Sequence, residues 1–296
     1  MEQPVKQKQK IPIGKQRADY DRRRIRTAMN ICAVLAVMAV CAQVYVIWSG
    51  VTVKRRYEQL AVNSVFEAVT VLPTGDGEED APAQMAARDG SDAMLTVDFE
   101  QLLSINSDTV AWLHVPMADV SYPVVYSPED NNYYLHRAFD GTNSAAGSIY
   151  LEYTNAPDFT DRHSLIYGHN MNDGSMFGSL QKVFREEGIY NTEPYFYLYL
   201  PDGGINCYRV FSFYETDKDS DTYLTFTEDN AYDWYVYYAR TVSEAGAETD
   251  NDNPILSSGI FLSRPPIVTL STCSGPVGTS RRFVVHGVLT DHPERR

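Results

Sequence analysis

Residues 266–289 read PIVTLSTCSGPVGTSRRFVVHGVL, a pattern typical of paired β-strands. Two runs in this stretch, 266–272 and 282–289, have the length and the β-branched and aromatic content of strands. The Ser-Gly-Pro sequence that follows Cys273 breaks the first run, because Gly and Pro favour turns. We therefore predict two strands joined by a turn, with Cys273 where the first strand ends and two arginines where the second begins.

Six further runs of the same kind occur earlier in the chain, separated by Gly, Asp and Asn. They lie at residues 110–115, 120–126, 147–153, 163–168, 195–200 and 207–214. Short strands at this spacing predict a closed β-barrel or a sandwich. Helices are predicted at residues 97–105, 175–187 and 229–245. The body of the chain is therefore expected to be mainly β with inserted helices.

Three kinds of side chain suggest acyl-transfer chemistry. A lone Cys in a strand is more often a buried apolar residue than a nucleophile, and a reactive thiol needs a base or a cationic partner. Among six histidines, His169 differs because it follows the strand at 163–168 and precedes the polar loop Asn-Met-Asn-Asp-Gly. His163, in contrast, is interpreted as part of a surface turn. Donors for a developing oxyanion could come from Arg281 or Arg282.

Taken together, these segments resemble the sortases, and most closely the class B sortases. The main motifs are Tyr167-Gly168-His169-Asn170-Met171 with Asp173-Gly174-Ser175-Met176-Phe177, then Thr269-Leu270-Ser271-Thr272-Cys273, then Arg282-Phe283-Val284-Val285. Supporting matches are Trp112-Leu113, Tyr122-Pro123-Val124-Val125, Asn131-Asn132-Tyr133-Tyr134-Leu135 and Gly147-Ser148-Ile149-Tyr150. The motifs occur in family order over residues 98–289, so their joint signal is stronger than that of any fragment.

The resemblance implies a fold and a set of site residues. The fold is an eight-stranded sortase β-barrel with N-terminal helices and a long inserted helix. The nucleophile falls on Cys273 and the histidine on His169. The arginine falls on Arg282 rather than Arg281, because the family places it directly before the hydrophobic-Val-Val run. Ser271 is implied as a substrate-contacting position.

The resemblance also implies an activity. The enzyme would be a cysteine transpeptidase that cleaves a C-terminal sorting signal of secreted proteins through a thioester acyl-enzyme. The acceptor would be an amine of a peptidoglycan precursor or of a pilin, and no cofactor would be needed. Two alternatives remain open. The first is a membrane-tethered cysteine protease, since a Cys-His pair also serves proteases. The second is a non-catalytic surface adhesin or receptor ectodomain in which Cys207 and Cys273 are joined.

The N-terminal part of the chain predicts a membrane anchor. Residues 27–48 carry no charge, and about 20 apolar residues cross the ~30 Å hydrocarbon core as a helix. The larger basic load precedes this run, which places residues 1–26 in the cytoplasm as a basic tail. A cleaved signal peptide fits less well, because the apolar run is longer than usual for one. We predict a helix and stalk linker over 49–92 and an extracellular catalytic domain over 93–296.

Charge and residue spacing exclude other classes of function. The net charge is −14, and the first 26 residues hold nine basic and three acidic side chains, so the rest of the chain carries −20. An acidic body argues against nucleic acid as a partner, because phosphate binding needs clustered Lys and Arg. The sequence has no Cys/His cluster with zinc-ligand spacing and no calcium-loop pattern, so no metal site is predicted.

Overall fold

The computed structural model describes residues 13–67, 95–186, 194–245, 259–275 and 278–290. The chain divides into two compact units, Met1–Val51 and Thr52–Arg296. Helix α1 (Ile13–Ser64) is a single helix that supplies most of the first unit and begins the second. Its segment Arg22–Tyr45 contains an 18-residue window with a mean hydropathy of 2.0 and is long and apolar enough to cross a membrane, a test that a signal sequence also passes.

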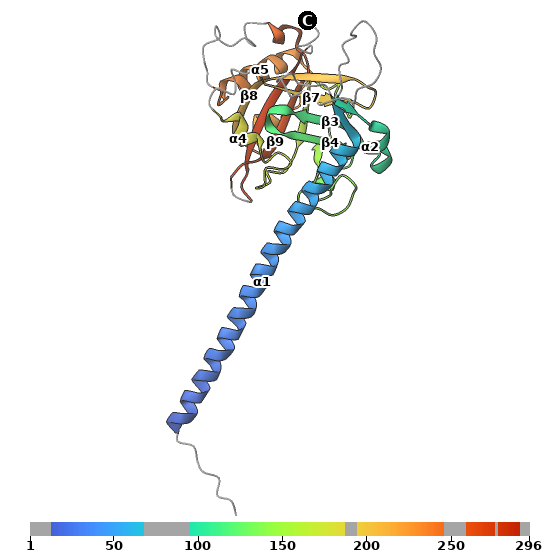
Figure 1. Ribbon diagram of the computed structural model, residues 1–296. Coiled ribbons are helices and arrows are strands. Elements are labelled where there is room, and N and C mark those ends of the chain that lie inside the picture. Colours follow the sequence, from blue (N-terminus) through green and yellow to red (C-terminus); the bar gives the residue numbers. More distant parts are fainter. Residues whose placement is uncertain (1–12, 68–94, 187–193, 246–258, 276–277, 291–296) are drawn as a thin grey trace, which may run out of the picture. The chain divides into compact units, whose positions relative to one another are not determined.

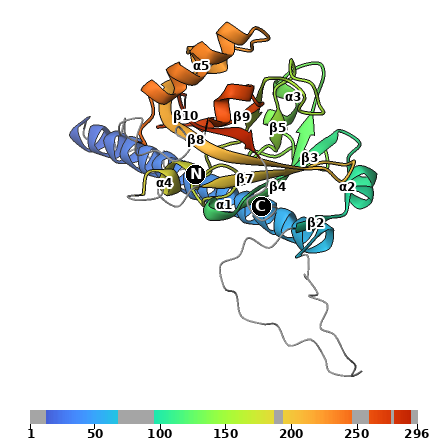
Figure 2. The same ribbon diagram turned by 90° about the horizontal axis from the view of Figure 1, so that it is seen from above.

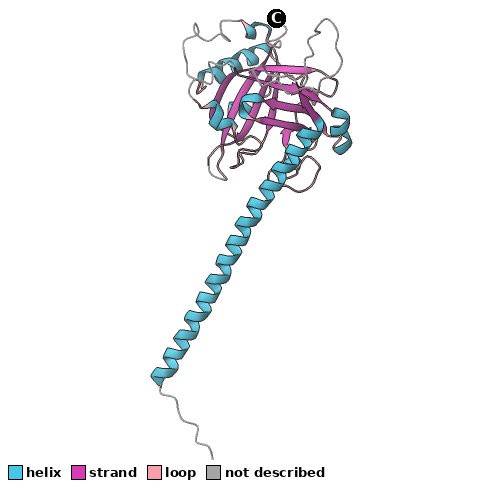
Figure 3. Cartoon of the chain, in the orientation of Figure 1, coloured by secondary structure: helices cyan, strands magenta, loops and turns pink. Residues whose placement is uncertain are grey.

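Eight strands of the second unit form a closed barrel with the neighbour order β10-β8-β7-β3-β4-β5-β6-β9 (Figures 1 and 3). Their bounds are β3 (Thr109–Val115), β4 (Val120–Tyr126), β5 (Ile149–Leu151), β6 (His163–Tyr167), β7 (Tyr195–Tyr199), β8 (Ile205–Asp217), β9 (Ile267–Cys273) and β10 (Arg281–Thr290). Two neighbouring pairs, β4 with β5 and β6 with β9, are parallel, and the others are antiparallel. The predicted eight-stranded barrel is confirmed.

The barrel wall buries apolar side chains on both of its faces. Alternate residues of the strands point inward, because successive side chains of a strand leave opposite faces. Phe283 and Val285 of β10 join the interior cluster, while Val284 and Val288 join a second cluster on the outer face. Helix α5 (Asp229–Thr241) covers that outer face over β8, β9 and β10 (Figure 2). Burial of the outer face by α5 explains why these strands carry apolar residues on both faces.

The smaller helices differ in part from the sequence prediction. Helix α2 (Phe99–Ile105) lies within the predicted 97–105, and the Asp98 side chain caps it by accepting a hydrogen bond from the Gln101 N–H at 2.9 Å. The helix predicted at 175–187 is wrong in length, since α4 covers only Leu180–Phe184. Met176 is buried there in a turn with a φ of 53°, which a continuous helix does not allow. Helix α3 (Asn132–Leu135) and three 3₁₀ turns, η1 (Pro116–Ala118), η3 (Asp221–Tyr223) and η4 (Ile260–Ser263), complete the described elements.

The second unit begins earlier in the chain than the predicted boundary at residue 93. Tyr57 of α1 is 7% exposed and joins the interior cluster. Its hydroxyl donates to the Gly147 carbonyl at 3.2 Å and accepts from the Phe139 N–H at 3.1 Å. Strand β1 (Val65–Glu67), which directly follows α1, pairs antiparallel with β2 (Leu95–Val97). The end of α1 is thus part of the folded body, and the remainder of the predicted stalk, 68–92, lies outside the described residues.

Candidate active site

Cys273 and Arg282 lie directly opposite each other at one end of the barrel wall. Cys273 is the last residue of β9, its side chain is exposed, and its partner in the antiparallel β10 is Arg282. Side chains of directly opposed residues leave the same face of a sheet, with Cβ atoms about 4.5–5.5 Å apart. The register therefore places the guanidinium beside the thiol.

His169 reaches the same edge of the sheet from the other side of β9. Strand β6 runs parallel to β9, and Tyr167 pairs with Ser271. When two parallel neighbouring strands end at the same level, the residues that follow them lie at the same edge of the sheet. His169 lies two residues beyond Tyr167, and Cys273 lies two residues beyond Ser271. The two predicted catalytic residues are thus placed at equivalent positions of adjacent strands.

Two local features fix the loop that carries His169. A Cβ atom on Gly168 would lie 2.4 Å from the Ile149 side chain and 2.8 Å from the Phe177 ring, so only Gly fits between the strand and the histidine. The side-chain amide of Asn170 donates a hydrogen bond to the Cys273 carbonyl at 2.8 Å. The loop is therefore tied to the end of β9.

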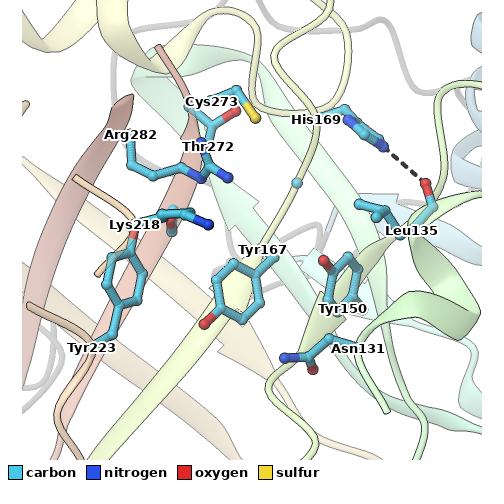
Figure 4. Close-up of a pocket in the computed structure, with 12 residues that line it drawn as sticks. Asn131, Leu135, Tyr150, Tyr167, His169, Lys218, Tyr223, Thr272, Cys273 and Arg282 are labelled. Carbon is cyan, nitrogen blue, oxygen red and sulfur yellow. Dashed lines mark hydrogen bonds between the residues drawn. The ribbon is translucent and has the colours of Figure 1, made fainter. Parts of the chain in front are cut away.

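A pocket of about 320 Å³ opens at this edge (Figure 4). Its lining includes all four predicted site residues, which are Cys273, His169, Arg282 and Ser271. The remaining lining residues are Asn131, Leu135, Tyr150, Tyr167, Gly168, Lys218, Tyr223 and Thr272. The structure thus brings together residues that are more than a hundred positions apart in the chain.

The His169 ring is held by a backbone carbonyl rather than by the thiol. Its Nε2 donates a hydrogen bond to the Leu135 carbonyl at 2.8 Å, and the ring is stacked with His136 at a centroid distance of 6.2 Å. Figure 4 shows this nitrogen turned toward Leu135 and away from the sulfur. Within the described residues, no hydrogen bond joins His169 to Cys273. The bond to Leu135 assigns a proton to Nε2 and leaves Nδ1 for other partners.

The two neighbouring arginines have different surroundings. Arg282 lines the pocket, and its Nη1 donates to the carbonyls of Thr279 at 3.2 Å and Arg281 at 3.0 Å. Arg281 instead forms an ion pair with Glu215. Adjacent strand residues leave opposite faces of the sheet. Only Arg282 is therefore directed to the side of Cys273.

Ser271 lies in the pocket wall, where its hydroxyl already has a partner. It is 1% exposed, and its Oγ is 2.8 Å from the hydroxyl of Tyr223. Burial raises the pKa of Tyr223 to about 12, against the opposing effects of the Ser271 hydrogen bond and the Arg282 charge. Burial, with the nearby Glu152 carboxylate and Cys273, also raises the pKa of Tyr150. Both phenols are therefore neutral hydrogen-bond donors near pH 7.

Sequence reasoning did not assign roles to the other polar residues of the pocket. Asn131, Tyr150 and Tyr167 are part of the family-like motifs, which could have marked them. Lys218 and Tyr223 come from the long segment between β8 and β9, which carries no motif. Lys218 directly follows the last residue of β8, and Tyr223 is the last residue of η3, with its hydroxyl 2.8 Å from Oγ of Ser271.

The interpretation of His163 as a surface residue is wrong. It is 1% exposed and lies on the outer face of the barrel wall, in contact with Tyr235 of α5. Its Nε2 is 2.8 Å from the hydroxyl of Thr269, which is also 2.7 Å from Nδ1 of the fully buried His286. The hydroxyl of Tyr235, on α5, lies 3.1 Å from Nε2 of His163 and completes this buried group. These residues pack on the same face of β9 as Cys273, farther along the strand, and do not line the pocket.

Acid should destabilise the protein through His163. Burial lowers the pKa of its imidazole to about 4, although hydrogen bonding to Leu224 and the Asp161 charge oppose the shift. The unfolded chain, with a pKa near 6.5, binds a proton over the interval in which the folded chain does not. The free energy of unfolding therefore falls as the pH drops from about 7 to 4, by roughly 3 kcal/mol for this residue.

The measurement is urea unfolding of the full-length protein in detergent at pH 7.5 and pH 4.5. The His163→Gln variant should lose less stability between these two pH values than the wild type loses. An equal loss in both proteins would show that His163 does not cause the acid sensitivity.

The adhesin alternative requires a Cys207–Cys273 disulfide, and the geometry opposes one. Neither cysteine forms a disulfide, and Cys207 is buried. On β10, Cys207 is paired with Thr290 and Cys273 with Arg282. These positions are eight residues apart on one strand, which is about 26 Å at ~3.3 Å per residue. A disulfide needs Cα atoms within ~7 Å.

The arrangement in the pocket is suited to acyl transfer. It offers an exposed thiol as a nucleophile, an imidazole to transfer protons and a guanidinium to stabilise an oxyanion. Over the ranges that the structure describes, no group of three His, Cys, Asp or Glu side chains lies close enough to hold a metal ion.

Comparison with known proteins points to one family. The model of the family described as "Sortase domain" matches residues 113–290. The chain is 33% identical over 195 residues to Sortase B of Listeria monocytogenes, covering 65% of this chain and 74% of that protein. It is similar in structure to Clostridium perfringens sortase B, with a TM-score of 0.55, 28% identity and coverage of 65% and 99% of the two chains. A Staphylococcus aureus sortase B–substrate complex gives a TM-score of 0.54 at 25% identity, over 65% and 84% of the chains.

Proposed function

The chain belongs to the sortase family of cysteine transpeptidases, and on that basis we propose that Cys273, His169 and Arg282 carry its reaction on secreted proteins at the cell surface. The observation that carries the proposal is their convergence in one pocket, from the ends of β9, β6 and β10. Each of the three side chains supplies a different component of acyl transfer.

The first half of the reaction forms a thioester. The Cys273 thiolate attacks a backbone carbonyl in the sorting signal, and the carbonyl oxygen becomes negative. Arg282 donates hydrogen bonds to this oxygen, a contribution of up to several kcal/mol for each well-placed donor. His169 donates a proton to the departing amine as the peptide bond breaks. The N-terminal part of the substrate is then held on the sulfur.

The second half of the reaction releases the product. An amine attacks the thioester carbonyl, and neutral His169 accepts the proton that this amine loses. Arg282 again stabilises the oxyanion, and the thiolate leaves as the new amide forms. Because Nε2 of His169 is bound to the Leu135 carbonyl, we assign both proton transfers to Nδ1.

The family and the pocket support a proposal for the substrate class. One relative of known structure is described as a sortase B–substrate complex. Here the pocket offers neutral phenols, an amide and two cations, which are Tyr150, Tyr223, Asn131, Lys218 and Arg282. Such groups bind the carbonyls and polar side chains of an extended peptide. We assign a C-terminal sorting signal as the donor, and an amine of a peptidoglycan precursor or of a pilin as the acceptor.

A transpeptidase transfers the acyl group of the thioester to an amine, whereas a membrane-tethered cysteine protease transfers it to water, so the products distinguish the two functions. The purified full-length protein is incubated with the best peptide from a sorting-signal library, with and without added glycinamide. We expect an amide product in the presence of the amine and slow hydrolysis in its absence, because both reactions consume the same thioester. If the products are hydrolytic at every amine concentration, the protease is the correct reading.

The arrangement in the cell is also a proposal. The apolar segment Arg22–Tyr45 overlaps the predicted anchor at 27–48, and we infer that residues 1–26 stay in the cytoplasm and the catalytic unit lies outside. The larger basic load before the apolar run supports this orientation.

Protease treatment of intact cells that express the protein should therefore remove the catalytic unit. An epitope tag at the N-terminus should survive the same treatment. Protection of the catalytic unit in intact cells, with digestion only after lysis, would reverse the orientation.

A further inference from the structure

The end of β9 is held in place by contacts of Ser274, the residue that follows the strand, as well as by strand pairing. Cys273 is the last strand residue, so the sheet constrains the nucleophile from one side only. The next residue, Ser274, is 1% exposed. Its N–H donates to the Arg281 carbonyl at 2.9 Å, and its carbonyl accepts from the Thr279 hydroxyl at 2.8 Å. Its own hydroxyl donates to Oε2 of Glu215 at 2.5 Å.

Glu215 is the one charged group among these contacts to Ser274, and it belongs to a different strand. It lies on β8 and pairs with Phe283, so it leaves the sheet on the face opposite Cys273. Its side chain is 18% exposed and forms an ion pair with Arg281. The guanidinium of Arg185 lies 3.9 Å from it. The carboxylate therefore lies against two guanidinium groups, and a charged acceptor makes a stronger hydrogen bond than a neutral one.

Further contacts make the position of Glu215 rigid. Its N–H donates to Glu244 at 2.8 Å, and Glu244 in turn binds Arg185 through two hydrogen bonds of 2.6 and 2.7 Å. Arg185 also lies 5.1 Å from the centre of the Phe283 ring. The two parallel hydrogen bonds between Arg185 and Glu244 fix the geometry of these side chains better than a single surface ion pair does.

We propose that Glu215 is a positioning residue for the nucleophile, acting through the Ser274 hydroxyl. The carboxylate does not reach the pocket lining and takes no part in bond formation. It holds Ser274, and with it the backbone that directs the Cys273 thiol toward the substrate carbonyl. Misplacing a reacting group by about 1 Å can cost ~10²-fold in rate, so loosening one of the contacts that fix this turn should cost about tenfold.

This inference rests on the proposed role of Cys273, and its test separates the two. The variants are Ser274→Ala, Glu215→Ala, the double variant and Cys273→Ala, each as full-length protein in detergent. Asp233→Ala is the matched control. Asp233 lies on α5, and its carboxylate accepts two hydrogen bonds from Arg264 at 2.8 and 2.7 Å, so this variant also removes a carboxylate paired with an arginine. Each protein is assayed for kcat and KM with the library-selected peptide and for alkylation of Cys273 by iodoacetamide.

Ser274→Ala and Glu215→Ala should each lower kcat about tenfold, with KM within twofold of the wild type. Alkylation by iodoacetamide should keep its rate, because a small reagent needs an accessible thiolate but no exact alignment. The double variant should be no more than about twofold worse than either single variant, since both remove the same contact. Glu215→Gln keeps an acceptor oxygen and should recover most of kcat, and Asp233→Ala should match the wild type.

A wild-type kcat in folded Glu215→Ala, or losses that multiply in the double variant, would overturn the proposal. If Glu215→Ala does not fold, the kcat of Ser274→Ala alone tests the positioning role, because that variant loses only one hydroxyl and should still fold. Turnover by Cys273→Ala would instead contradict the proposed function. An inactive Cys273→Ala together with a fully active Ser274→Ala would contradict only the positioning role.

Discussion

Cys273→Ala is expected to abolish both turnover and labelling by a thiol-directed substrate analogue. The thiol is the one nucleophile assigned to the reaction, and no other residue of the pocket lining supplies a thiol. His169→Ala should also lose turnover, but its thiol should still be alkylated slowly, because only proton transfer and activation are lost. Residues that act as one unit are not additive, so the double variant should be little worse than Cys273→Ala.

Cys207→Ala is the matched control for this experiment. Cys207 carries a thiol outside any disulfide, as Cys273 does, but it is buried near the other end of the barrel wall. Its removal should leave turnover within a few-fold of the wild type. Turnover retained by Cys273→Ala would contradict the function, and turnover retained by His169→Ala would contradict the assignment of the proton-transfer residue.

Arg282→Ala should lower the rate by about 10²-fold or more, which is the scale of losing one oxyanion donor. Arg281→Ala should have a mild effect. The two residues are adjacent and carry the same charge, so the comparison holds side-chain chemistry constant. Their side chains leave opposite faces of the sheet. Arg282 lies opposite Cys273 and lines the pocket, whereas Arg281 forms an ion pair with Glu215. The measurement is kcat/KM of each variant with the same peptide.

Arg282→Lys adds a second comparison at this position. A lysine keeps the charge but lacks the planar set of donors that a guanidinium presents. We expect it to recover only part of the lost rate. Equal losses in Arg281→Ala and Arg282→Ala, or a larger loss at Arg281, would show that position along β10 does not decide the role.

The strands could be predicted from the sequence because each one is short, rich in β-branched or aromatic residues and bounded by turn residues. Their neighbours could not be predicted in this way. The parallel pairing of β6 with β9 places His169 beside Cys273, and it depends on two segments about a hundred residues apart. The family-like motifs identified the pair, whereas local periodicity gives no information on such contacts.

The errors have a common physical cause, which is burial by distant parts of the chain. His163 follows two charged residues and looks like a surface residue, but α5 covers it. Met176 fits an apolar helical stripe with Leu180, Val183 and Phe184, but it is buried in a turn that precedes α4. Tyr57 lies in a helix as predicted, but it precedes the predicted start of the catalytic domain at residue 93, and its contact with Gly147 makes it part of the barrel unit. Local sequence carries no signal for any of these contacts.

The central claim is that a thioester forms on Cys273. The most direct measurement is the intact mass of the full-length protein, acid-quenched within one turnover after mixing with the library-selected peptide. The account predicts an added mass equal to the N-terminal part of the cleaved peptide, located on Cys273 by digestion and discharged when glycinamide is added before the quench. Peptide turnover without an adduct on Cys273, or with an adduct on another residue, would contradict it.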